Sequence, residues 1–135
     1  MIFLDTSYFV ALAMPADALH ATALKWSECL SGPFLTTEFV LLEVVNMLSG
    51  VGRRAKAHAL LESLANNSNI RVERASSKLF HLGLRLHANR PDKSWSLTDC
   101  ISFEVMRGAA LTDALTYDQD FEQAGFRPLL RLSPP

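Results

Sequence analysis

The sequence MIFLDT, residues 1–6, is a short apolar run that stops at a carboxylate. A run of this length followed by a polar residue predicts a buried strand over Ile2 to Leu4. The next residues predict a helix from about Thr6 to Met14, which Pro15 ends because proline cannot continue a helix. A short buried strand that leads directly into a helix is typical of proteins with a parallel sheet.

The same alternation continues along the rest of the chain. Thr37 can cap a long apolar helix that extends to about Leu48, and Ser96 can cap another helix that Gly108 ends. Residues 118–126 are interpreted as a loop or a short helix. Further strands are predicted at 34–36, 70–73, 114–116 and 129–132, and further helices at 18–30, 53–65, 76–87 and 97–106. This alternation predicts an α/β sandwich around a mainly parallel sheet.

Length and composition indicate a single domain over residues 1–135. With 49% hydrophobic residues, the chain can bury a core of its own. The two cysteines form no CxxC pair and show no ligand spacing with the four histidines, which argues against a disulfide framework and a Cys/His zinc site. No apolar stretch approaches the roughly 18 residues of a membrane span, so we expect a soluble, cytoplasmic protein. The net charge of −1 neither favours nor excludes a nucleic-acid partner.

Four acidic residues lie at the edges of predicted core elements. Asp5 and Asp118 directly follow predicted strands. Asp99 lies in the first turn of a predicted helix, and Glu43 lies in the helix after the second strand. Because ligands of parallel sheets bind beyond the carboxyl ends of the strands, all four side chains can converge there. Clustered carboxylates suit a hard divalent cation, so the pattern suggests a metal site.

Three of these acids also have an ordinary structural explanation. Asp5 can cap the helix that begins at Thr6. Asp99 completes a capping pattern that starts at Ser96, and a carboxylate near a helix start suits the helix dipole. Asp118 lies in a segment where an acidic turn residue is common. None of the three would identify a site alone.

Glu43 is harder to explain by structure. Its neighbours from Val40 to Leu48 are apolar around nearly the whole circumference of the predicted helix, which predicts burial on all sides. A buried carboxylate needs a partner or a metal, and this helix contains no lysine or arginine. Asn46, three residues on, can orient the carboxylate from the neighbouring helix surface. The burial expected of Glu43 therefore strengthens the case for a metal site.

Taken together, the segments around these acids resemble the PIN-domain family of ribonucleases, and within it the VapC-like toxins of bacterial and archaeal toxin–antitoxin modules. The resemblance covers essentially the whole chain. Its segments are residues 2–7, Thr36 and Thr37 with Glu43 and Asn46, Asp92 and Lys93 with residues 95–100, residues 114–121, and residues 124–126. The resemblance implies a three-layer α/β/α sandwich, a divalent-metal site and hydrolysis of RNA phosphodiester bonds.

The resemblance also implies roles for individual residues. Thr6 and Asn46 take supporting polar positions. Asp120 stands two residues from Asp118 and can share or replace its role. An all-oxygen site of this kind suits Mg²⁺ or Mn²⁺. By the resemblance, the catalytic and metal-binding acids are Asp5, Glu43, Asp99 and Asp118, with Asp5 and Asp99 the strongest candidates for direct ligands.

Two other functions stay open at this point. The stretch from Leu4 to Ser7 resembles the opening of aspartyl-phosphate phosphatases of the haloacid dehalogenase type, but those need a second aspartate where this chain has Ser7. A catalytically degenerate PIN-like module that only binds RNA or a protein would keep its acids for helix capping. Magnesium-dependent stabilisation and loss of activity on chelation distinguish the nuclease from such a binding module.

Partners follow mainly from the resemblance. It implies an RNA substrate, a cognate antitoxin protein encoded beside the toxin, and a homodimer. The helices between Thr37 and Ala65 carry more apolar surface than one small core uses, which is consistent with an interface.

Overall fold

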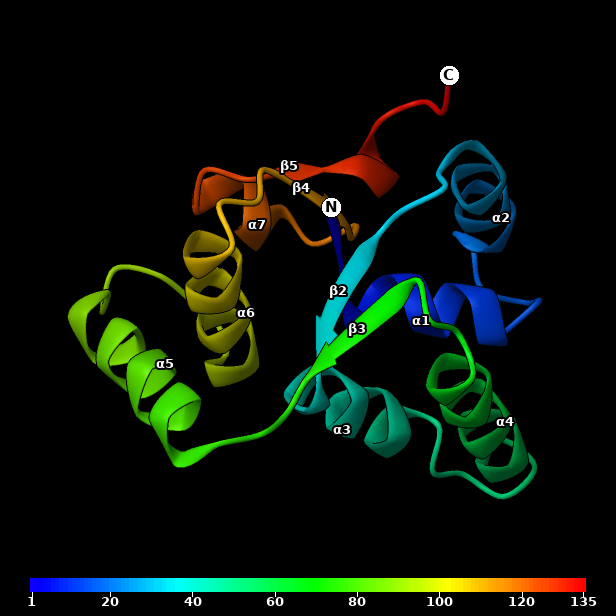
Figure 1. Ribbon diagram of the computed structural model, residues 1–135, viewed down its shortest axis with the longest axis horizontal. Coiled ribbons are helices and arrows are strands. Elements are labelled where there is room, and N and C mark those ends of the chain that lie inside the picture. Colours follow the sequence, from blue (N-terminus) through cyan, green and yellow to red (C-terminus); the bar gives the residue numbers. More distant parts are fainter.

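Five short strands form one sheet in the computed structural model, which describes residues 1–135 (Figure 1). Every pair of neighbouring strands is parallel, in the order β3-β2-β1-β4-β5. This arrangement confirms the predicted α/β fold with a parallel sheet. The strands are β1 (Ile2–Leu4), β2 (Phe34–Thr37), β3 (Ile70–Glu73), β4 (Asp113–Leu115) and β5 (Arg127–Pro128).

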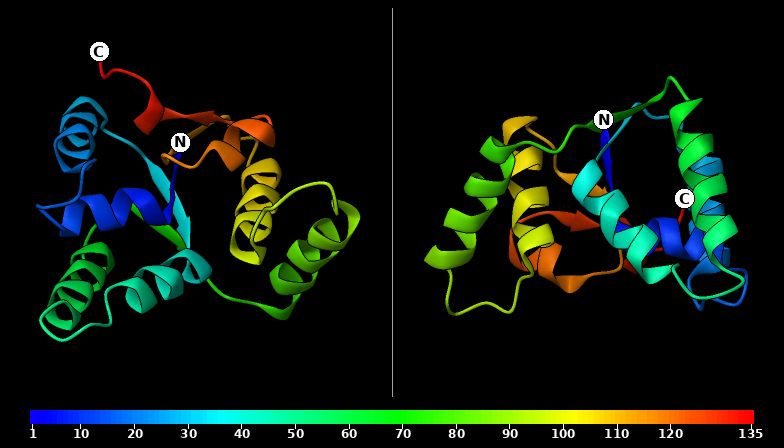
Figure 2. Two further views of the ribbon diagram at one scale, coloured as in Figure 1. Left: turned by 180° about the vertical axis from the view of Figure 1, so that it is seen from behind. Right: turned by 90° about the horizontal axis from the view of Figure 1, so that it is seen from below.

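Helices cover both sides of this sheet. Figures 1 and 2 show α5 and α6 on one side and α1, α2 and α4 on the other, which gives the three layers of an α/β/α sandwich. None of the helices combines the length and the apolar character that crossing a bilayer requires. The helices are α1 (Thr6–Ala13), α2 (His20–Cys29), α3 (Glu38–Met47), α4 (Arg54–Ala65), α5 (Ser77–Asn89), α6 (Leu97–Gly108) and α7 (Gln119–Gln123), and a 3₁₀ helix, η1, spans Leu129–Arg131.

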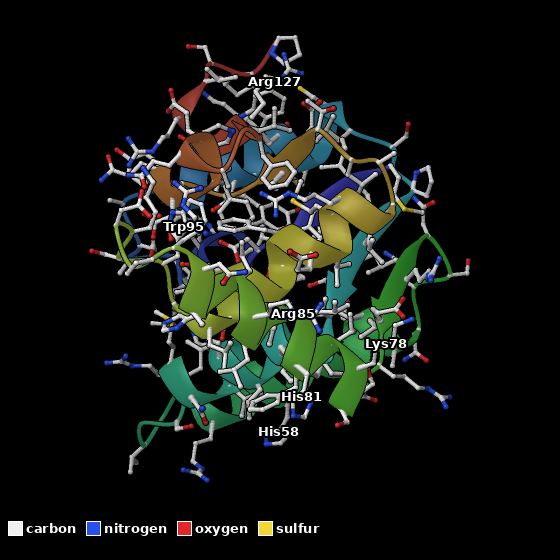
Figure 3. The ribbon with its side chains drawn as sticks, turned by 90° about the vertical axis from the view of Figure 1, so that its left-hand side faces the viewer. His58, Lys78, His81, Arg85, Trp95 and Arg127 are labelled. Carbon is white, nitrogen blue, oxygen red and sulfur yellow. The ribbon has the colours of Figure 1, made fainter.

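An aromatic cluster joins the sheet to α6 and α7. The ring of Phe103 lies 4.9 Å from that of Phe121 and 5.0 Å from that of Trp95, both edge to face. Phe121 in turn lies 6.3 Å from Phe3 on β1. Trp95, labelled in Figure 3, is buried, and its indole N–H donates to the side chain of Gln123 at 3.2 Å. These contacts fix the start of α6, where Asp99 lies, relative to the sheet.

Two of the predicted helix caps are present in the structure. The Thr37 hydroxyl accepts a hydrogen bond from the Val40 backbone N–H at 3.1 Å and starts α3. Ser96 caps α6 in the same way. The end of this helix lies one residue later than predicted, because α6 includes Gly108 and Ala109 forms its cap.

The last predicted strand is wrong. Residues 129–132 were predicted to form a β-strand, but Leu129–Arg131 forms η1. The fifth strand is the preceding pair Arg127–Pro128. The neighbouring strand β4 ends at Leu115, so the ladder stops at the pair of Ala114 and Pro128. Beyond it the chain turns, and the Leu130 N–H donates to the Thr116 carbonyl at 3.1 Å. This turn places Arg131 beside the end of β4.

The expected all-round burial of α3 is also wrong. Only Val40 and Val44 are buried within the helix, whereas Leu42 and Met47 are 58% and 53% exposed. The helix packs against α1, α4, α6 and β2, and its face with Leu42 and Met47 stays at the surface. Glu43 is consequently half-buried, and its isolation within an apolar helix does not by itself demand a metal.

Candidate functional site

The ends of β1 and β4 place two polar residues side by side. In the parallel pairing of these strands, Leu4 lies opposite Leu115, so the next residues, Asp5 and Thr116, leave the sheet together. The Thr116 hydroxyl donates a hydrogen bond of 2.8 Å to Oδ2 of Asp5, and both residues are buried. The carboxylate of Asp5 is therefore held in place by the sheet itself.

Thr116 connects several parts of the site. Besides donating to Asp5, its hydroxyl oxygen accepts the backbone N–H of Asp118 at 3.0 Å and lies 3.3 Å from the hydroxyl of Ser7. Sequence reasoning gave Thr116 no role of its own. The available signal was a threonine directly after a predicted buried strand, where an apolar residue would otherwise extend the core. Its importance depends on the pairing of β1 with β4, which the sequence alone does not reveal.

A pocket of about 230 Å³ opens beyond these strand ends. The structure brings all four acids named from the sequence to its wall, from four separate segments of the chain. Asn46, expected to orient Glu43, is exposed and does not line the pocket. The lining residues are Asp5, Thr6, Ser7, Val10, Asp17, Leu19, Glu43, Met47, Asp99 and Asp118.

A second, overlapping group of acids includes Asp120. Carboxylate oxygens of Asp99, Asp118 and Asp120 all lie within 4.8 Å of one another. Asp118 also caps α7, because its Oδ1 accepts the backbone N–H of Asp120 at 2.9 Å. Asp99 and Asp118 thus belong to both groups, whereas Asp5 and Glu43 belong only to the pocket and Asp120 only to the second group.

The capping explanations hold for Asp99 but not for Asp5. Oδ2 of Asp99 accepts the Ser96 backbone N–H at 3.2 Å, and the Ser96 hydroxyl accepts the Asp99 N–H at 3.0 Å, so the capping box is complete. The box fixes one oxygen of Asp99 while the residue lines the pocket. Asp5 stands at the start of α1, yet its side chain makes no capping hydrogen bond. Its burial is therefore not explained by the helix.

Burial makes two of these acids difficult to ionise. Burial, together with the nearby charges of Glu43 and Asp118, raises the pKa of Asp5 to about 7 against the opposing hydrogen bond from Thr116. Burial together with the charges of Asp5 and Asp118 also raises the pKa of Asp99 to about 7. No lysine or arginine lines the pocket to offset these charges. The electrostatics of the pocket thus favour a bound cation.

Two further lining residues bear on whether a cation fits. The hydroxyl of Thr6 is buried without a hydrogen-bond partner in the protein, so its oxygen is free to contact a bound ion or its water. Asp17 is a fifth acid at the wall, although its Oδ1 already accepts the Leu19 backbone N–H at 2.8 Å. Asp17 was missed because only the path of the chain after α1 brings it to the pocket. The polar groups of the wall offer only oxygen atoms, the ligands that hard divalent cations prefer.

Comparison with known proteins gives one consistent match. The PIN domain family model matches residues 2–127. The chain is 32% identical over 127 residues to the 23S rRNA-specific endonuclease VapC20 of Mycobacterium tuberculosis, covering 93% of this chain and 95% of that protein. The crystal structure of Mycobacterium tuberculosis VapC20, described as a Sarcin-Ricin loop cleaving toxin, matches with a TM-score of 0.88 at 28% identity, over 96% of this chain and 98% of that one. FitAcB from Neisseria gonorrhoeae shares the fold, with a TM-score of 0.69 at 17% identity over 95% of this chain and 98% of that one.

Proposed function

This chain belongs to the PIN-domain family, and we propose that it is a divalent-metal-dependent endoribonuclease that acts as the toxin of a toxin–antitoxin module. The observation that carries the proposal is the convergence of Asp5, Glu43, Asp99 and Asp118 on one pocket without a neutralising cation. Asp5 makes no capping hydrogen bond, so a degenerate module that keeps its acids for capping does not explain it. The phosphatase alternative is not favoured, because the family match spans nearly the whole chain.

The metal ion of this proposal is Mg²⁺ or Mn²⁺. Asp99 and Asp118 would be its central ligands because they belong to both acid groups, and Asp5 and Asp120 each belong to one of them. When bound, such an ion offsets charge on the scissile phosphate and lowers the pKa of a nearby water. Thr116 holds the carboxylate of Asp5, and Ser96 holds that of Asp99, so the acids meet their ligand with little reorganisation.

The substrate class is RNA. The relative at 32% identity is named a 23S rRNA-specific endonuclease, and the matching crystal structure is described as a Sarcin-Ricin loop cleaving toxin. A hairpin with the sarcin–ricin loop sequence is therefore the first defined substrate to test. Cellular RNA as substrate would also place the protein in the cytoplasm.

We further propose a cognate antitoxin protein and a homodimer. Exposed apolar side chains on and after α3 support an interface there, since Leu42 and Met47 are more than half exposed and Val51 is fully exposed. Light scattering at several protein concentrations tests the dimer, and a monomer at the highest concentration would contradict it. Co-expression with the protein encoded by the adjacent gene, followed by co-purification and loss of RNase activity, tests the antitoxin.

The deciding experiment is cleavage of RNA with controlled metal. Purified protein is incubated with total cellular RNA and with the hairpin, in Mg²⁺, in Mn²⁺ and in a chelator, and the cut ends are mapped. We expect cleavage with either metal and none with the chelator. Cleavage that persists in chelator would contradict the proposal.

A matched pair of variants separates the site from the scaffold. Asp99→Asn keeps an oxygen for the Ser96 N–H but removes the charge, and we expect cleavage to fall by about a thousand-fold or more with the fold intact. Glu104→Gln on the same helix changes a carboxylate that pairs with Arg107 away from the pocket, and it should cleave like the wild type. Full activity of a folded Asp99→Asn protein would exclude this assignment.

A further inference from the structure

Tyr117 is an exposed aromatic residue at the rim of the acid pocket. It lies between Thr116 and Asp118, and 43% of it is exposed. Its backbone N–H donates to the Ser7 hydroxyl at 3.0 Å, and both Ser7 and Asp118 line the pocket. The neighbouring residues on both sides are anchored as well, so the position of Tyr117 relative to the acids is well defined.

Arg131 lies against this ring. Its guanidinium carbon is 4.3 Å from the centroid of the Tyr117 ring, and its Nε donates to the Tyr117 carbonyl at 2.5 Å. The turn that carries Arg131 is tied down too, because the Leu130 N–H donates to the Thr116 carbonyl. Arg131 forms no ion pair with a carboxylate, so most of its N–H donors stay available.

The neighbouring Arg127 differs from Arg131, because its N–H donors are already used. Arg131 and Arg127 both line a hollow of about 280 Å³ beside α7 and β5, and Figure 3 labels Arg127. Arg127 donates two hydrogen bonds of 2.9 Å to the carboxylate of Asp113, which neutralises it. Arg131 is thus the cation in this hollow that can take an anionic ligand.

An exposed tyrosine alone needs no functional explanation. Here, however, hydrogen bonds fix the backbone of Tyr117 at its amide and its carbonyl, and a cation with free donors lies on its ring. Proteins that bind single-stranded nucleic acid combine such an aromatic surface for a base with a cation for the backbone. Arginine suits this role because its planar group can stack and can also bind a phosphate through two donors.

We propose that Tyr117 and Arg131 form a nucleotide-binding platform beside the acid pocket, where a base next to the scissile phosphate stacks on the platform and its phosphate binds Arg131. The inference rests on the proposed RNase function and adds residues that position the substrate. It predicts that the platform acts mainly on substrate binding, because neither side chain lines the acid pocket.

Binding is tested without cleavage in an Asp99→Asn background. The probes are a single-stranded oligoribonucleotide and the sarcin–ricin loop hairpin, each carrying the fluorescent base 2-aminopurine at successive positions. Adding Tyr117→Ala should weaken binding roughly 5- to 100-fold and abolish the quenching that marks a stacked base, whereas Tyr117→Phe should preserve both. Adding Arg131→Ala should weaken binding and lower the salt slope of log affinity by about one, and Arg131→Lys should keep that slope.

Arg127→Ala is the matched control, because it removes an arginine of the same hollow that is already paired. We expect it to leave RNA affinity nearly unchanged. With native Asp99, Tyr117→Ala should raise KM with a smaller effect on kcat, and thermal melting checks that Arg131→Ala is folded. RNA binding that is unchanged in Tyr117→Ala and Arg131→Ala, or lost equally in Arg127→Ala, overturns the platform. Wild-type protein without metal-dependent cleavage would instead overturn the proposed function, whatever the binding results.

Discussion

The acid pocket has a rigid side and a surface side. Asp5 and Asp99 are only 4% and 8% exposed, and each is held by a hydrogen bond, Asp5 from Thr116 after β4 and Asp99 from Ser96 at the cap of its own helix. Glu43 belongs to the surface side, because it is half-buried on a helix whose outer face is exposed. The difference indicates that the buried pair sets the position and the electrostatics of the site. Glu43 then makes a smaller contribution to the charge of the pocket.

The largest expected effect is that of Asp5→Asn. We expect RNA cleavage to fall by about a thousand-fold or more, because the change removes a buried negative charge from the pocket. The same variant should be more stable than the wild type in chelator at pH 8, since it no longer buries a charged group. Cleavage assays and denaturant unfolding measure the two effects. A variant that loses activity and also stability at pH 8 would show that Asp5 is mainly structural.

The second effect is a pH dependence of stability in the metal-free protein. Burial raises the pKa of Asp5 from 3.8 to about 7, so the folded state holds a proton that the unfolded state has released. The contribution of this group to stability is therefore full below about pH 4, falls as the pH rises towards 7, and is level above it. The loss for one such group is on the order of 2–4 kcal/mol. Unfolding curves in chelator from pH 4 to 8 measure it.

Two additions sharpen this measurement. Asp5→Asn should make the decline between pH 4 and 7 shallower, since it removes one of the two buried acids with a raised pKa and leaves Asp99. Mg²⁺ should stabilise the wild type more at pH 8 than at pH 5, because the ion binds the ionised carboxylates. A wild-type protein whose stability rises steadily from pH 4 to 7 would contradict the raised pKa of the buried pair.

Thr116→Val is the third effect and tests what holds the rigid side. Valine matches threonine in shape but cannot donate to Asp5, and the loss of such a supporting group typically lowers metal affinity or activity 10- to 100-fold. In the wild type the hydrogen bond from Thr116 lowers the pKa of Asp5, so its loss should raise that pKa. The acid limb of the pH–rate profile should then move to higher pH. Thr112→Val, at an exposed threonine before the same strand, is the control. Equal activity of the two variants would show that Asp5 needs no support.

The same contrast explains what could be predicted from the sequence. The strand at Ile2–Leu4 and the caps at Thr37 and Ser96 follow from local patterns, and the structure has them where expected. The convergence of the acids could be anticipated because parallel strands end at one edge. The role of Thr116 could not, because its hydrogen bond to Asp5 joins residues 111 positions apart.

Two errors have a common physical cause. Apolar residues at 129–132 were taken for a strand, and apolar residues all round α3 for burial, although Leu42 and Met47 are exposed. Hydrophobicity predicts that a segment has a partner but does not say which element supplies it. In the first case the short strand β4 offered no further pairing, and in the second one face of the helix stays at the surface.

Glu43→Gln carries the smallest expected effect. The sequence argument for Glu43 assumed full burial, which the structure contradicts, so its charge is partly screened by solvent. We expect cleavage to fall by roughly ten-fold, with little change in stability. Glu38→Gln, at an exposed acid on the same helix that does not line the pocket, is the matched control. If Glu43→Gln instead loses as much activity as Asp5→Asn, partial exposure does not weaken an acid in this pocket. Position around the ligand, rather than burial, would then decide the contribution of each carboxylate.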